Sequence, residues 1–208
     1  MKRLLFFLIS LGMTLAMQSQ ALHFETFDNG IPADWTLLND NNTAYQQDYA
    51  DAWTVRADIG FPAPSVVSTS WFNRQNYADR WLVSSPVYVP DSGYHFMMSA
   101  ACVDPAYRDG FEVRISTTGG DAMDSFPVSS VIKVNYCDTV FHEHHTSLDA
   151  YVGDTIWIAV IQNSWDMNLL IVDNLRVAKP EEPELSIVKF NCPSSITYGD
   201  TKILGGTI

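Results

Sequence analysis

The stretch TIWIAVIQ, residues 155–162, decides the fold class because almost all of its eight positions carry β-branched, aromatic or other apolar side chains. A run of this length and composition is typical of a β-strand. Successive side chains of a strand point to opposite faces of the sheet, so both faces of this strand are apolar. We therefore expect it in the middle of a sheet, with other parts of the protein packed over each face.

The stretch FEVRIS, residues 111–116, shows a different strand pattern. Its apolar residues Phe111, Val113 and Ile115 alternate with polar residues. Such alternation predicts a strand with one face in the core and the other in water. Segments rich in β-branched or aromatic residues predict further strands at residues 52–57, 65–70, 81–89 and 94–101.

Turn-forming residues separate these segments, as in DNGIPADW (28–35), PDSGY (90–94) and STTGGD (116–121). The sequence shows no convincing helical period. Many short strands with turn signals between them are typical of two packed antiparallel sheets. We predict an all-β fold, an antiparallel jelly-roll β-sandwich over residues 22–178.

The N-terminal residues 1–21 have the pattern of a secretory signal peptide. Lys2 and Arg3 precede an apolar run that ends near Met17, and small residues follow at Ser19 and Ala21. The run is too short, and too interrupted by Gly12, to span a bilayer comfortably. We expect cleavage after Ala21, no membrane insertion, and a location outside the cell or on its surface.

The composition changes again near the C-terminus. Residues 179–184 contain two prolines and three glutamates, which is typical of a short stiff linker. Residues 185–208 resemble the first strands of a second, Ig-like β-domain that stops before it could bury a core. We therefore expect the chain to be a fragment of a longer protein.

The chain is strongly acidic, with 12 Lys and Arg against 24 Asp and Glu. Without Lys2 and Arg3 the balance is 10 against 24, a net charge of −14. Phosphate backbones and anionic membranes repel such a protein, so nucleic acid is a poor partner. An excess of carboxylates instead favours hard cations such as calcium.

Three cysteines occur, at positions 102, 137 and 192. Export would permit a disulfide between Cys102 and Cys137. Buried free thiols are an equally good interpretation, because one cysteine is left over and the spacing is wide.

Four longer stretches carry a resemblance to a known family. They are FETFDNGIPADWTLLNDNN (24–42), DRWLVSSPVYV (79–89), DGFEVRISTTGGDAMDSFPV (109–128) and VGDTIWIAVIQNSWDMNLLIVDNLRV (152–177). In order and spacing they are similar to the cleaved adhesin domain family, the jelly-roll modules in the haemagglutinin/adhesin regions of gingipain-type proteases. The resemblance covers residues 24–177 and implies a role in cell adhesion.

The resemblance also implies a structural calcium ion. In modules of this kind, acidic residues of the first strand and an acidic pair in the last strand bind the ion, which corresponds here to Glu25, Asp28, Asp173 and Asn174. The chain departs from the family by carrying Asn174 where a second acid is usual, which removes one charge. Read from the residues alone, Asp173 and Asn174 begin a turn and cap local backbone.

Two other polar stretches invite a metal interpretation, and we favour a simpler one for each. In the loop that contains Asp40, Asp48 and Asp51, the spacing does not match an EF-hand, which favours a solvated loop. FHEHHTS, residues 141–147, lacks the pattern of a zinc-protease motif, and we interpret it as a polar loop of unliganded histidines.

No catalytic motif stands out, and we expect no enzyme within these residues. Asp104 and Asp109 could resemble the paired carboxylates of a glycosidase, but a turn between two strands explains them more simply. No Gly-x-Ser-x-Gly elbow is present.

Aromatic residues supply the remaining functional hint. Most of the six tryptophans belong to predicted strands and should fill the core, whereas Trp71 and Trp165 lie in polar, loop-like surroundings. An exposed Trp or Tyr can stack on a sugar or anchor a protein. We take Trp71, Trp165, Tyr77 and Tyr107 as candidate ligand-binding residues.

These observations predict a secreted, non-enzymatic adhesion or binding module that engages extracellular proteins or glycans. The alternative is a carbohydrate-binding accessory domain of an exported hydrolase or protease. Exposed aromatics beside a groove would favour sugar binding, and a broad patch without a groove would favour protein adhesion.

Overall fold

The computed structural model describes residues 21–39, 44, 49, 51–59, 64–180, 189–191 and 205–207. Within these ranges the regular structure is β, with short 3₁₀ turns that include Met123–Ser125 and Asp149–Tyr151, and no α-helix. The described residues include no helix that is long and apolar enough to cross a membrane. The predicted signal peptide, residues 1–21, lies almost wholly outside the described residues.

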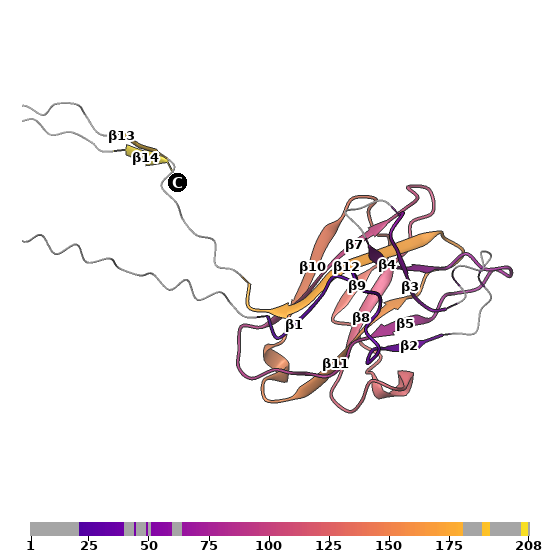
Figure 1. The fold of residues 1–208 in the computed structure, drawn as a ribbon, viewed down its shortest axis with the longest axis horizontal. Helices are drawn as coiled ribbons and strands as arrows, with labels where there is room; N and C mark the ends of the chain where they lie inside the picture. The colour runs from indigo at the N-terminus through magenta and orange to yellow at the C-terminus, as the bar shows by residue number, and fades with distance from the viewer. Residues whose placement is uncertain are drawn as a thin grey trace, which may run out of the picture.

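The strands form two six-stranded antiparallel sheets that pack face to face as a β-sandwich (Figure 1). The first sheet has the order β10-β7-β12-β4-β3, and β1 also pairs with β12. Its strands are β10 (His142–Ser147), β7 (His95–Cys102), β12 (Leu169–Ala178), β4 (Ser65–Thr69), β3 (Thr54–Arg56) and β1 (His23–Glu25).

The second sheet has the order β2-β5-β11-β8-β9, and β6 also pairs with β11. Its strands are β2 (Thr36–Leu38), β5 (Arg80–Val83), β11 (Thr155–Gln162), β8 (Phe111–Ser116), β9 (Ile132–Val134) and β6 (Val87–Tyr88). Consecutive strands often lie in different sheets, so the chain crosses repeatedly from one layer to the other.

The central position of β11 follows from its sequence, as expected. Ile156, Ile158 and Val160 face the main core between the two sheets. On the opposite face, Ala159 and Ile161 pack with other apolar residues in a second cluster. The segment that follows β8 supplies part of this cover. Burial of apolar surface on both faces therefore holds β11 at the middle of its sheet.

The prediction of a water-facing side for β8 is wrong, because the polar residues of this strand are covered as well. We expected Glu112 and Ser116 to face water, but both are buried. Glu112 forms ion pairs with Arg114 and Lys133, each with an N–O distance of 2.9 Å. Ser116 donates a hydrogen bond to the backbone oxygen of Ser125 at 2.7 Å. The polar face of β8 is thus covered, and its polar groups are satisfied by partners.

The histidine stretch was predicted wrongly as a loop, because it forms the edge strand β10. All six of its residues pair with β7, from His142 opposite Ala100 to Ser147 opposite His95. His144 packs edge-on against Phe111, with the ring centroids 5.1 Å apart. A strand at the edge of a sheet needs one neighbour and only one packed face, so a polar sequence suffices.

The longest strand, β12, connects the two ends of the described domain. It contacts β7 along one side, and β4 followed by β1 along the other. A β-bulge interrupts its pairing with β7 between Asp173 and Arg176. The backbone N–H of Leu22 donates to the oxygen of Val177 at 2.8 Å, so the chain enters and leaves the sandwich side by side.

Beyond the sandwich, β13 (Lys189–Asn191) pairs with β14 (Gly205–Thr207) in a two-stranded antiparallel sheet. These six residues are the described part of the predicted second domain, 185–208. Most of the predicted linker, residues 179–184, lies outside the described residues.

Candidate functional site

Two adjoining depressions lie at the end of the sandwich where β12 begins, which we call the loop end. Three loops contribute to both of them, namely β4–β5 (residues 70–79), β7–β8 (103–110) and β11–β12 (163–168). Met167 lines both depressions. Function is often placed on loops that a rigid sheet scaffold holds in position.

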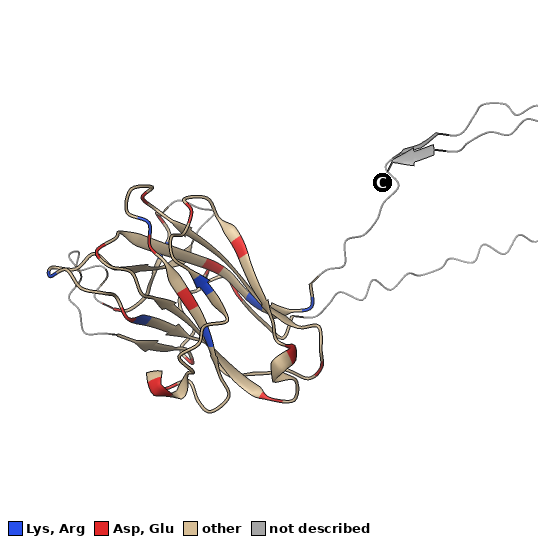
Figure 2. Cartoon of the chain, turned by 180° about the vertical axis from the view of Figure 1, so that it is seen from behind, with Lys and Arg blue, Asp and Glu red and all other residues tan. Residues whose placement is uncertain are grey.

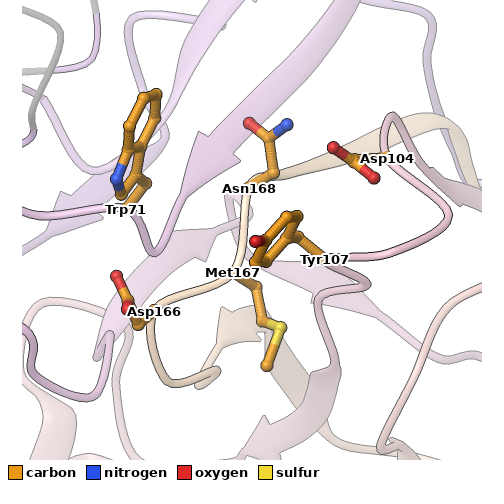
Figure 3. A pocket seen from close by; sticks show the side chains of 6 residues that line it. All are labelled: Trp71, Asp104, Tyr107, Asp166, Met167 and Asn168. Atoms are coloured by element: carbon orange, nitrogen blue, oxygen red, sulfur yellow. The ribbon is translucent and has the colours of Figure 1, made fainter.

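The first, which we call the Trp71 depression, has a volume of about 330 Å³. Trp71 lies on one side of the segment 166–168, and Tyr107 and Asp104 lie on the other (Figure 3). The lining residues are Trp71, Asp104, Tyr107, Asp166, Met167 and Asn168.

The second, the Tyr77 depression, has a volume of about 430 Å³. It extends toward the chain after β9, which contributes Asn135 and Tyr136. Its lining residues are Tyr77, Arg108, Lys133, Asn135, Tyr136, Asn163, Ser164, Trp165 and Met167. Both volumes fall in the range of small-ligand sites, about 300–1,000 Å³.

The four aromatic residues that the sequence suggested for binding all lie at the loop end. Trp71 and Tyr107 line the first depression, and Tyr77 and Trp165 line the second. Their exposed fractions are 38% for Trp71, 42% for Trp165, 55% for Tyr107 and 63% for Tyr77. By contrast, Trp35, Trp53 and Trp81 are buried, as expected of core tryptophans.

Backbone pairing holds the aromatic pair of the Tyr77 depression in place. Tyr77 and Trp165 form an antiparallel β-bridge, and the N–H of Ala78 donates to the oxygen of Ser164 at 2.8 Å. The Tyr77 and Trp165 rings pack edge to face, with their centroids 4.9 Å apart. Two loops that are far apart in the sequence thus form one pre-organised aromatic wall.

Behind the depressions, Asp109 joins three elements of the loop end. Its side chain is fully buried. The Oδ1 atom of Asp109 accepts hydrogen bonds from Ser70 Oγ at 2.6 Å and from Gln162 Nε2 at 2.8 Å. Ser70 Oγ in turn accepts from the N–H of Met167 at 3.0 Å. One carboxylate, near the end of the β7–β8 loop, therefore connects the start of the β4–β5 loop with the end of β11.

Burial raises the pKa of Asp109 to about 6, although the hydrogen bonds from Ser70 and Gln162 lower it. The Ser164 hydroxyl and the Asn168 N–H lie near enough to lower the pKa as well. Neither has hydrogen-bond geometry to the second carboxylate oxygen, Oδ2, which has no partner in the structure. An acid with an unpaired buried oxygen is favoured in its protonated form.

Gly110 lets the β7–β8 loop approach the chain after β9. A Cβ atom at this position would lie 2.5 Å from the backbone oxygen of Val134 and 2.6 Å from that of Asn135. The N–H of Gly110 donates to Ser164 Oγ at 2.6 Å. Any larger residue would force the β7–β8 loop away from Val134 and Asn135, and Asn135 lines the Tyr77 depression.

Cys102 and Cys137 are both buried free thiols behind the same loops. Cys102 Sγ donates to the backbone oxygen of Asp109 at 3.4 Å. A hydrogen bond between the two side chains raises the pKa of Cys102 and lowers that of Cys137. The two cysteines predicted as a possible pair are therefore neighbours, and they are in the reduced form.

The residues suggested for calcium lie together beside the middle of β12, where its partner changes from β4 to β1. Pairing of β1 with β12 places Glu25 opposite Leu175, beside Asp173 and Asn174. Burial raises the pKa of Asp173, and the negative charges of Asp28 and Glu25 raise it further. Asn174 has a left-handed backbone with φ of 54°. The four residues thus occupy one corner of the sandwich.

In this structure each of the three carboxylates accepts a local hydrogen bond. Asp173 accepts from the N–H of Asn174 at 2.7 Å, and Asp28 accepts from Thr26 Oγ1 at 2.7 Å. Glu25 accepts from the N–H of Phe27. Within the described part of the chain, no three His, Cys, Asp or Glu side chains are close enough to hold a metal ion, and this includes the histidines of β10. The donor types suit calcium, but the acidic side chains would have to turn toward one point to hold it.

The sequence suggested several of the residues that build the loop end, but not all. Arg108, Tyr136 and Asp166 were missed because exposed loop residues of these types are common. Asp109 was interpreted as an ordinary turn residue. One usable signal was Gln162, a polar residue at the end of an otherwise apolar strand, since a buried amide requires polar partners.

No protein-family model matches the sequence, and no curated protein matches it. Several solved structures, however, are similar to this chain. The K3 cleaved adhesin domain of Lys-gingipain from Porphyromonas gingivalis has a TM-score of 0.60 and 19% identity, over 77% of this chain and 99% of that one. The K1 domain of the same protein has a TM-score of 0.58 and 18% identity, over 76% of this chain and 98% of that one.

Carbohydrate-binding modules are also similar in structure. A CBM61 module in complex with β-1,4-galactotriose has a TM-score of 0.50 and 13% identity, over 75% of this chain and 95% of that one. The CBM22-2 xylan-binding domain of Xyn10C from Paenibacillus barcinonensis has a TM-score of 0.50 and 10% identity, over 77% and 100%. Such identities establish the fold alone. Residues 21–180 therefore have the β-sandwich fold shared by the cleaved adhesin domains of Lys-gingipain and these carbohydrate-binding modules.

Proposed function

We propose that the chain is a non-enzymatic module that binds glycans at the loop end. The observation that carries this proposal is the pair of adjoining depressions whose walls include Trp71, Tyr107, Tyr77 and Trp165. Aromatic rings present an apolar face on which a sugar ring can stack, and amide and hydroxyl groups beside them can bind the sugar hydroxyls. A hollowed surface favours a sugar over a flat protein partner.

The structural neighbours support a binding role. The adhesin domains and the carbohydrate-binding modules share the sandwich, and two of the modules bind galactotriose or xylan. We also infer a jelly-roll topology from the repeated crossing of the chain between the two sheets. The signal-like N-terminus supports a place outside the cell, as one unit of a larger surface protein.

The carboxylates at the loop end do not support hydrolysis of the bound sugar. Glycosidases need two carboxyl groups that flank the scissile bond. Asp109 is fully buried and hydrogen-bonded to Ser70 and Gln162, so it cannot contact a substrate. The two carboxylates that line the Trp71 depression are both held by local hydrogen bonds. Asp104 accepts from the N–H of Ala106 at 2.8 Å, within its own turn, and Asp166 accepts from Gln75 Nε2.

Affinity electrophoresis and calorimetry of the purified chain against soluble polysaccharides and oligosaccharides would test glycan binding. Trp71→Ala and Trp165→Ala should each weaken binding about tenfold or more, because each removes a stacking surface. Tyr88→Ala is the control, since Tyr88 is also an exposed aromatic residue but belongs to β6 and lines neither depression. If Tyr88→Ala weakened glycan binding as much as Trp71→Ala, the loop end would not be the binding site. If no glycan bound to the chain, the proposal would be refuted.

We further propose a structural calcium ion at the corner formed by Glu25, Asp28, Asp173 and Asn174. Burial raises the pKa of Asp173, and repulsion from Asp28 and Glu25 raises it further. A bound cation would offset this repulsion, which supports the proposal. Backbone carbonyls and water would complete the six to eight oxygens that calcium takes. The ion would join the first and last strands of the sandwich.

Thermal unfolding in EGTA and in millimolar calcium would test this second proposal. Calcium at about 100 times its dissociation constant should stabilise the folded chain by about 2.7 kcal/mol, which corresponds to a Tm increase of roughly 5–10 °C. Asp173→Asn should abolish most of the increase. Asp124→Asn, which removes an exposed acid elsewhere, should leave it unchanged. Identical melting curves of the unmodified chain in EGTA and calcium would refute the ion.

A further inference from the structure

The two depressions of the loop end differ in charge, although the protein as a whole is strongly acidic. Asp104 and Asp166 line the Trp71 depression, and no basic residue is among its lining residues. The Tyr77 depression has the opposite character, with Arg108 and Lys133 in its lining and no acidic residue. Figure 2 shows Asp and Glu spread over the domain, with Lys and Arg at fewer places.

Arg108 is the cation best placed to meet a ligand. Its side chain is exposed, and its guanidinium carbon lies 6.0 Å from the centroid of the Tyr136 ring. Among the described residues it makes no ion pair. A guanidinium stacked on an aromatic ring keeps its N–H groups at its edge, where two of them can bind both oxygens of a carboxylate.

Lys133 adds to the positive charge. Its Nζ atom pairs with Glu112 Oε1 at 2.9 Å, while Arg114 pairs with the other oxygen of Glu112 at 2.9 Å. One negative charge thus faces two positive charges, which leaves a surplus of one. With Arg108, these four charged side chains sum to a net charge of +2.

The remaining walls suit a sugar that carries such a carboxylate. Tyr77 and Trp165 supply apolar surface, and Asn135 and Ser164 supply groups that can bind hydroxyls. Asn163 Nδ2 donates to Glu112 Oε1 at 2.8 Å, which fixes its amide beside the two cations. In the neighbouring Trp71 depression, Asp104 and Asp166 would repel a second anionic unit.

Building on the glycan-binding function proposed above, we propose that the ligand carries an acidic sugar, of the uronic or sialic acid class. Its carboxylate binds Arg108 in the Tyr77 depression, and a neutral sugar unit occupies the Trp71 depression. The net charge of the whole chain, −12 at pH 7, disfavours long polyanions. The ligand class is therefore an isolated acidic residue on a neutral glycan.

Calorimetry with matched pairs of oligosaccharides tests this inference. The probes are 3′-sialyllactose with lactose, and glucuronic acid-substituted xylo-oligosaccharides with unsubstituted ones. In at least one pair the acidic member should bind about 10- to 100-fold more tightly, as expected of a charge-assisted bidentate contact. The difference should shrink as sodium chloride rises from 50 to 500 mM. Polygalacturonate, a continuous polyanion, should bind more weakly than the preferred acidic oligosaccharide.

Arg108→Gln should remove the preference, so that the acidic and neutral members of a pair bind this variant with equal affinity. Arg74→Gln is the control, because Arg74 is an exposed arginine of the β4–β5 loop outside both depressions. Equal binding of acidic and neutral members would overturn the acidic-sugar inference and leave the glycan-binding function standing. An acidic preference that survives Arg108→Gln would overturn the assigned site. If no member of these pairs and no other glycan binds, the proposed function itself fails.

Discussion

Asp109 shows how one buried side chain can control a binding surface that it does not touch. It lies at the back of the loop end, and its partners Ser70 and Gln162 are 39 and 53 residues away in the sequence. The structure gives this acid a raised pKa of about 6, because burial outweighs its two hydrogen bonds. Its protonation state therefore affects the stability of the whole domain.

We predict that Asp109→Asn changes the pH dependence of unfolding. Between pH 3.8 and about 6 the native protein keeps the Asp109 proton, whereas the unfolded chain has lost it. The unmodified protein therefore loses stability as the pH rises through this range, by about 3 kcal/mol in total. Asparagine keeps the acceptor for Ser70 and Gln162 without the charge, so the variant gains that amount relative to the unmodified protein above pH 6.

Urea unfolding at a series of pH values from 4 to 7.5 measures the difference between the two proteins. Asp104→Asn, which removes a water-accessible carboxylate from the same loop, is measured in parallel as the control. If the difference between Asp109→Asn and the unmodified protein were constant with pH, Asp109 would not titrate in this range.

At the scale of single elements, the bulge in β12 determines where the calcium candidates lie. Asn174 has a φ of 54°, and the pairing of β12 with β7 shifts register between Asp173 and Arg176. A left-handed backbone costs an ordinary L-residue roughly 1–2 kcal/mol, which Asn tolerates better and Gly avoids. The bulge thus explains why a polar residue interrupts an otherwise apolar strand.

Substitutions at position 174 separate the backbone role from the proposed ligand role. In EGTA, Asn174→Ala should lower the unfolding free energy by about 1 kcal/mol, and Asn174→Gly should leave it nearly unchanged. In calcium, Asn174→Gly should show a smaller increase in Tm than the unmodified chain, because it lacks the side-chain oxygen. An alanine variant as stable as the unmodified protein in EGTA would show that the bulge carries no strain.

Elements differ in how well the sequence predicted them, for a physical reason. The predicted bounds of β8 and β11, residues 111–116 and 155–162, are those of the structure. Both strands could be predicted because the order of apolar and polar residues within each segment indicates a strand. The strand β10 was mistaken for a loop, because an edge strand of histidines lacks an apolar face. The aromatic residues of the loop end could be named, but not Asp109, since its partners are distant in the sequence.

At the scale of the whole molecule, β12 links the two ends of the sandwich. It begins next to Asn168 of the Trp71 depression and ends at Ala178, where the chain leaves beside β1. Ten residues of strand extend about 30 Å, so the loop end lies far from the point where the domain joins the rest of the chain.

The side-by-side entry and exit of the chain also determine how the domain responds to mechanical force. β1 and β12 are antiparallel, and a load applied to Leu22 and Lys179 enters the pair at its open end. Such a load breaks the hydrogen bonds between β1 and β12 one after another, instead of loading all of them at the same time in shear. Single-molecule pulling should therefore detach β1 at a lower force than pulling between residues 22 and 168, which loads the same pair in shear. Equal forces in the two directions would contradict this description.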